Sequence, residues 1–173
     1  RTLLTSLVIA QAVGWAVPTI SAADRSQTVI VVVGAAGAPE YAPEFARWAG
    51  LWEQACSKGG AEFIAIGLDG DGASTDREKI RKALAAESQQ TTAPLWLILI
   101  GHGTFDGQDY KLALPGPDIT ATELATLLNK NRAGRQLVVN MTTSSGASLA
   151  ALQKEGRIVI TATKSGTEKN ATV

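Results

Sequence analysis

The 173-residue sequence has little from which a disulfide framework, a zinc site or a nucleic-acid-binding surface could be built. It contains one cysteine, Cys56, and one histidine, His102, so no intramolecular disulfide can form and a zinc ion would lack ligands. Basic and acidic residues both total 16, which gives a net charge of zero, and aromatic residues make up 5%. Nucleic-acid-binding domains normally carry a basic excess. We therefore expect a domain held by an ordinary hydrophobic core, without metal, cofactor or nucleic-acid partner.

Charge is also scarce at the start of the chain. Arg1 is followed by an uncharged, mostly apolar stretch over 3–17 and by three small residues at 21–23. This order is typical of a secretory signal peptide, which we predict over 1–23. The apolar stretch is shorter than the roughly 20 residues of a membrane-spanning helix. A buried or amphipathic N-terminal helix is the alternative. The expected mature protein is exported, periplasmic or extracellular, and does not contact a membrane.

After residue 23, apolar β-branched runs alternate with helical patterns. Strands are expected at 28–33, 62–66, 95–100, 136–140 and 157–161, and helices begin near Pro43, Thr75, Thr120 and Ala147. Such alternation predicts an α/β fold, a three-layer, mostly parallel sheet of Rossmann-like topology with helices on both faces. We expect one domain over 24–173. Because no closing helix follows the last strand, we also expect this domain to be truncated at its C-terminal end.

His102 is the strongest candidate for chemistry. It directly follows the apolar strand 95–100 and lies between Gly101 and Gly103. Ligands of open parallel sheets bind beyond the carboxyl ends of the strands, where this loop should lie. Histidine is the usual general acid or base near neutral pH, and the Gly103 amide is a candidate oxyanion donor. The alternative is a structural loop histidine.

A second loop of interest, 142–146, follows the strand 136–140 and reads Thr-Thr-Ser-Ser-Gly. Its hydroxyls could supply a nucleophile, and the helix that follows could bind an anion at its first amides. We also expect the loop to cap that helix. The two loops together form the expected functional pole of the domain.

The order of these two loops resembles that of the caspase and legumain class of cysteine peptidases. In that class a His-Gly pair follows one strand, and the nucleophilic cysteine ends the next parallel strand shortly before a Ser-Gly pair. Matching Ser145 and Gly146 to that pair implies that His102 is in the base position and Gly103 in the oxyanion position. Thr143 then occupies the nucleophile position, with Ser144 beside it. The resemblance covers most of the chain after residue 23 and implies a caspase/legumain-like fold.

The missing cysteine decides which function the resemblance implies. A thiol ionises readily, whereas a hydroxyl needs a strong local base. We therefore expect an exported homologue of these peptidases that lacks cysteine-protease activity and serves as a peptide-binding or structural module, with a peptide or protein segment as partner. One alternative is an active hydrolase that uses Thr143 or Ser144 with His102. Another is a flavodoxin-like module that binds a small ligand or an anion.

Three other patterns are weaker. Cys56 lies in a run similar to the caspase cysteine motif, but it precedes His102 and falls on the apolar stripe of a predicted helix, so we expect it to be buried. The glycines at 34–37 lack the third glycine of a dinucleotide-binding loop. The acidic run at 69–72 lacks the later ligands of a calcium loop and is expected to be a surface turn.

Overall fold

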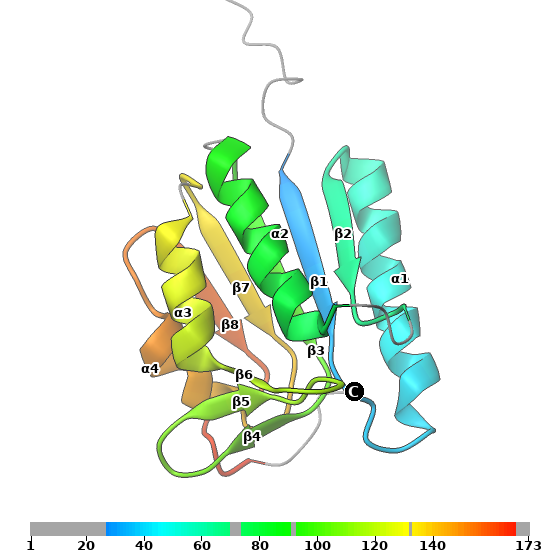
Figure 1. Cartoon of the computed structure of the whole chain (residues 1–173), viewed down its shortest axis with the longest axis vertical. Coiled ribbons are helices and arrows are strands. Elements are labelled where there is room, and N and C mark those ends of the chain that lie inside the picture. Colours follow the sequence, from blue (N-terminus) through cyan, green and yellow to red (C-terminus); the bar gives the residue numbers. More distant parts are fainter. Residues whose placement is uncertain (1–26, 70–73, 91–92, 132, 169–173) are drawn as a thin grey trace, which may run out of the picture.

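The computed structural model describes residues 27–69, 74–90, 93–131 and 133–168 (Figure 1). The predicted signal peptide lies outside these residues. None of the helices in the described part is long and apolar enough to cross a bilayer.

The centre of the molecule is a five-stranded sheet in the order β2-β1-β3-β7-β8, in which every neighbouring pair is parallel. The strands are β1 Thr28–Val33, β2 Glu62–Ile66, β3 Leu95–Ile100, β7 Gln136–Asn140 and β8 Arg157–Thr161. The strand interiors are apolar or β-branched, as in strands covered on both faces, although β2, β7 and β8 begin with Glu62, Gln136 and Arg157. The predicted α/β class and the five predicted strands are confirmed.

Helices cover both faces of the sheet. They are α1 Tyr41–Gly59, α2 Asp76–Gln90, α3 Ala121–Lys130, the 3₁₀ turn η2 Ser145–Ser148 and α4 Leu149–Leu152. Figure 1 shows α2 and α3 side by side on one face, while α1 packs beside β1 and β2. The larger core lies on the α2–α3 side, and a smaller core, which includes Phe45, Ala49 and Cys56, lies under α1.

The α1 side of the sheet is unevenly covered. Helix α1 contacts β1, β2 and β3, whereas Ile158 and Ile160 of β8 keep 65% and 51% of their surfaces exposed. A shallow hollow of about 320 Å³ lies there, between Trp48 of α1 and residues of β7 and β8. The two faces of the sheet therefore differ in how completely helices cover them.

Capping boxes begin two of the helices, but only one box is complete. At α2 the Thr75 hydroxyl accepts from the Glu78 amide at 3.3 Å, and the Glu78 carboxylate accepts from the Thr75 amide at 2.9 Å. At α3 the Thr120 hydroxyl accepts from the Glu123 amide at 3.0 Å. The Glu123 carboxylate instead binds Arg77 and Arg81 from α2, at 2.6 and 2.7 Å. This side chain thus ties α2 to α3.

A small antiparallel sheet was only partly expected. It contains β4 Gly103–Phe105, β5 Tyr110–Leu112 and β6 Ile119–Thr120, and it lies at the carboxyl ends of the large sheet's strands (Figure 1). In the sequence, only the run at 111–114, just before Pro115, suggests a strand here. Strands of two or three residues are too short to show a periodic pattern, so β4 and β6 could not be predicted.

Candidate functional site

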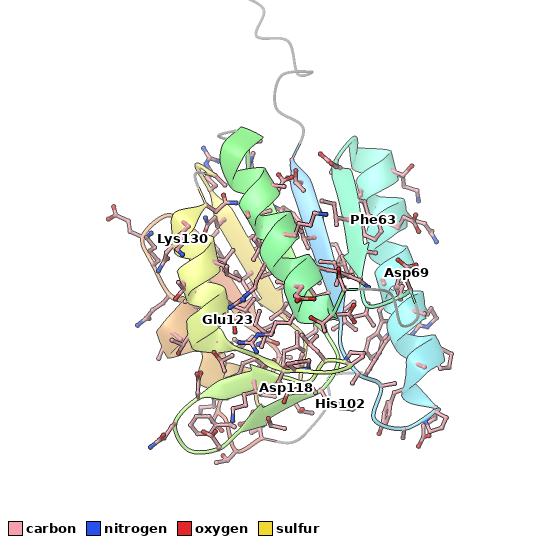
Figure 2. All side chains as sticks on the ribbon, in the orientation of Figure 1. Phe63, Asp69, His102, Asp118, Glu123 and Lys130 are labelled. Atoms are coloured by element: carbon pink, nitrogen blue, oxygen red, sulfur yellow. The ribbon has the colours of Figure 1, made fainter. Side chains whose placement is uncertain are left out.

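The two loops chosen from the sequence do meet at the carboxyl edge of the large sheet. His102 lies between β3 and β4, and Thr143 and Ser144 follow β7, the strand next to β3. Figure 2 shows His102 at this edge, between the small sheet and the first turn of α1. The contact between the loops is direct, because Thr143 Oγ1 hydrogen-bonds the backbone of Gly103.

The His102 ring is held by the loop after β1 and by the first turns of α1. Its Nε2 lies 2.9 Å from the carbonyl oxygen of Ala36, in the loop after β1. A carbonyl can only accept, so Nε2 carries a proton, and in the neutral ring Nδ1 is the acceptor. The rings of Tyr41 and Phe45 contact it edge-on, with centroids 5.0 and 5.4 Å away. Among the described residues no hydrogen bond joins this ring to Thr143 or to Ser144.

Thr143 and Gly103 form a reciprocal pair. The Gly103 amide donates to Thr143 Oγ1 at 2.9 Å, and the Thr143 hydroxyl donates to the Gly103 carbonyl at 2.7 Å. One hydroxyl therefore satisfies both polar groups of one backbone residue. The expected oxyanion donor and the expected nucleophile are bonded to each other, and neither is free in this arrangement.

The glycines beside His102 have different reasons to be glycine. Gly101 has a φ of +139°, which side-chain-bearing residues rarely adopt. At Gly103 the reason is packing, since a Cβ there would collide with the Thr143 carbonyl and the Tyr110 ring. The sequence could indicate the turn at Gly101, but it could not reveal the close packing at Gly103.

Ser144 has an unusual backbone conformation for a residue with a side chain. Its φ of +56° and ψ of +13° are left-handed, and it is the only such non-glycine residue in the described part of the chain. Its amide donates to the carbonyl of Glu168 at 2.9 Å. Such strained residues persist where surrounding contacts hold them, and they are frequent at functional sites.

The cap of the following 3₁₀ turn comes from an unexpected segment. We expected the hydroxyls of the 142–146 loop to cap it, but Ser144 makes no side-chain cap bond. Thr163, after β8, accepts from the Gly146 amide at 2.9 Å through its own hydroxyl. The Ser145 hydroxyl accepts in turn from the Thr163 amide at 2.9 Å. The cap therefore crosses between two strands, and a reading of local sequence could not find it.

Beneath the loop lies a buried polar network that the sequence did not reveal as a unit. Thr142 Oγ1 lies 2.6 Å from the Tyr110 hydroxyl and donates to Asn140 Oδ1 at 2.8 Å. The Asn140 side-chain amide donates to the Ser148 hydroxyl at 3.0 Å. All four residues are completely buried. One signal was available, because the buried strand β7 ends in an asparagine that needs partners.

Burial affects the ionisation of this network. It raises the pKa of Tyr110 to about 12, although hydrogen bonds with Thr142 and Asn140 act in the opposite direction. Tyr110 is therefore neutral over the physiological range and serves as a fixed hydrogen-bonding group. The network forms a rigid floor under the Thr143 loop.

A pocket opens beside the reciprocal pair, and we call it the pole pocket. It measures about 560 Å³ and is lined by residues of β4 and the turn after it, the Thr143 loop and the segment after β8: Gly103, Thr104, Phe105, Gly107, Thr143, Ser144, Gly166 and Thr167. None of these residues carries a charge. Gly166 packs against Phe105 so closely that a Cβ there would touch the aromatic ring.

The other chemical candidates have structural surroundings. Cys56 is 4% exposed and lies in the core under α1, as predicted, and this burial raises the pKa of its thiol. Part of the acidic turn at 69–72 lies outside the described residues. Within the described ranges no group of three or more His, Cys, Asp or Glu residues is arranged to hold a metal ion.

No family model matches this chain, and no curated protein matches its sequence.

Proposed function

We propose that this domain is an exported, non-hydrolytic relative of the caspase and legumain class that holds a peptide or protein segment in the pole pocket without cutting it. The observation that carries the proposal is the pair of hydrogen bonds between Thr143 Oγ1 and the Gly103 backbone. The parallel sheet and the order of the two loops along it are compatible with such a relative.

Acyl transfer needs a nucleophile whose proton passes to a base and an amide that is free to bind the oxyanion. The Thr143 hydroxyl donates its hydrogen bond to the Gly103 carbonyl, and the Gly103 amide donates to Thr143 Oγ1. His102 Nε2 donates to the Ala36 carbonyl, so Nδ1 is the acceptor of the neutral ring. The nucleophile and the oxyanion donor that hydrolysis would need are therefore bonded to each other, while the pocket beside them stays open.

The test is a binding and cleavage assay with one peptide library. We expect the immobilised full chain to retain a subset of random peptides. Mass spectrometry of the peptides released from it should find them intact. Thr167→Trp, which places a large ring in the pole pocket, should abolish retention. Thr122→Trp is the matched control, because Thr122 is exposed on α3, outside the pocket lining. Retention that is absent, or unchanged by Thr167→Trp, would refute the proposal.

An active hydrolase is the second candidate, and the left-handed conformation of Ser144 favours it. A fluorophosphonate probe tests this candidate directly. We expect no labelling of the full chain. Labelling that disappears in Thr143→Ala or Ser144→Ala, together with peptide cleavage, would replace the non-hydrolytic proposal with this one.

A further inference from the structure

The outer edge of β4 is a place where an extended peptide can pair. The Ala113 amide donates to the His102 carbonyl at 3.0 Å, and the Asp106 amide points to the Asp109 carbonyl at 3.5 Å. Residues 102 and 106 therefore turn their polar groups toward β5. Because these directions alternate along a strand, Gly103 and Phe105 turn theirs away from β5. The bonds of Gly103 to Thr143, on that outer side, agree with the alternation.

Only one of these two outward residues is free to pair with a peptide. Thr143 occupies both polar groups of Gly103, while among the described residues no loop or side-chain hydrogen bond uses the amide or carbonyl of Phe105. Phe105 also lines the pole pocket. A peptide strand added at Phe105 would therefore run beside the pocket and direct alternate side chains toward it.

The charges near the pocket decide which side chain fits. The lining carries no ionisable group. Two acidic residues adjoin the lining in sequence, and one of them, Asp106, accepts hydrogen bonds from the amides of Asp109 and Gln108 and from the Lys111 ammonium. These contacts hold the pKa of its carboxyl well below the usual range. The Glu168 carboxylate accepts from the Lys164 amide at 2.7 Å. The lining itself therefore offers a charged peptide side chain no counter-charge in return for the water it loses.

From these observations we infer that the pole pocket takes an uncharged aliphatic or aromatic side chain of a peptide that adds to β4 as a strand through the Phe105 amide and carbonyl. The Phe105 ring and the glycines of the lining offer an apolar wall to such a side chain. This inference rests on the proposed function and specifies its ligand.

The first experiment varies the peptide. The probes are short blocked peptides of alternating serine and valine in which one central position is Leu, Phe, Glu or Lys, and binding to the full chain is measured by calorimetry. We expect the Leu and Phe peptides to bind at least about tenfold more tightly than the Glu and Lys peptides. Equal or tighter binding of a charged peptide would overturn the inference about the side chain.

The second experiment tests the pairing. Single N-methyl groups are placed in turn along the Leu peptide, and each removes one backbone donor. Pairing with Phe105 predicts that sensitivity alternates, with a loss of about tenfold at the residue opposite Phe105 and little change at its two neighbours. Uniform sensitivity or none would overturn the pairing.

A protein variant gives an independent check. Phe105→Pro removes an amide that points away from β5, a change that edge strands tolerate, while Phe105→Ala removes the ring but keeps the amide. We expect Phe105→Pro to bind about tenfold more weakly than Phe105→Ala, and equal affinities would refute pairing through this amide. The N-methyl series decides the same question if Phe105→Pro does not fold.

If no probe and no library peptide binds, the proposed function fails. If peptides bind without these preferences, only the inference fails.

Discussion

Two neighbouring threonines at the pole have very different surroundings. Thr142 is completely buried and joins Tyr110 to Asn140, whereas Thr143 is half-buried and bonds the backbone of Gly103. The first contact is part of the floor of the domain, and the second covers groups that a peptidase would leave open. Adjacent hydroxyls of the same residue type can therefore serve stability and site chemistry separately.

Among variants of the buried network around Thr142, Asn140→Ala should have the largest effect on stability. Asn140 Oδ1 accepts from the amide and the hydroxyl of Thr142, and its side-chain amide donates to Ser148. Loss of the side chain leaves several buried groups without partners, so we expect the free energy of unfolding to fall by about 3–4 kcal/mol. Urea denaturation followed by circular dichroism measures it. Gln54→Ala, on the exposed side of α1, is the control and should change stability by less than about 0.5 kcal/mol.

The next variant, Tyr110→Phe, removes one hydroxyl from the same network. We expect a loss of about 1–2 kcal/mol near neutral pH, because the Tyr110 hydroxyl lies 2.6 Å from Thr142 Oγ1 and 3.3 Å from Asn140 Oδ1. A smaller loss than in Thr143→Ala would contradict the division between the two threonines.

This variant also predicts a pH dependence. The pKa of Tyr110 is about 12 in the folded state and starts from the ordinary value of 10.0 in the unfolded state. Its stabilising contribution is therefore complete below pH 10 and is lost as the pH rises toward 12. The native protein should lose about 2–3 kcal/mol more than Tyr110→Phe across this interval. Parallel denaturation profiles for the two proteins would show that burial does not raise this pKa.

At the half-buried threonine, Thr143→Ala should have a smaller effect on stability, at most about 1 kcal/mol, because the two Gly103 groups it uncovers lie beside the open pole pocket. The Gly103 amide should then exchange its hydrogen faster, as measured by hydrogen–deuterium exchange. Thr143→Ser keeps Oγ and is the matched control, with exchange near that of the native protein. Unchanged exchange in Thr143→Ala would show that the hydroxyl does not protect this amide.

The smallest expected effect has the opposite sign. Ser144→Gly relieves a left-handed conformation, and we expect the free energy of unfolding to rise by about 0.5 kcal/mol after the entropy of glycine is included. Thermal denaturation is the measurement. A loss of stability would show that the Ser144 side chain makes a contribution larger than the strain of its backbone.

The sequence was sufficient for the parts of this fold that depend on long, regular patterns. All five parallel strands and the complete capping box at Thr75 follow from apolar runs and a local motif. The predicted helix start at Pro43 lies within the first turns of α1, which begins at Tyr41. These features arise from neighbours in the chain, so they can be recognised without the tertiary structure.

The candidate site was predictable in its location but not in its contacts. Parallel strands β3 and β7 lie side by side, so the loops containing His102 and Thr143 had to meet at one edge. Which groups pair there depends on distant segments, such as Ala36 for His102 and Thr163 for the cap at Gly146. The function expected from the resemblance remains a prediction.

The reciprocal pair also affects how the domain can change over generations. A cysteine at 143 would replace a strong hydroxyl donor and acceptor by a thiol that is weak in both roles, so both bonds to Gly103 would weaken together. The first step toward a thiol nucleophile would thus lower stability. Selection for a folded domain would oppose that step, and a lineage that acquired this threonine would tend to keep it.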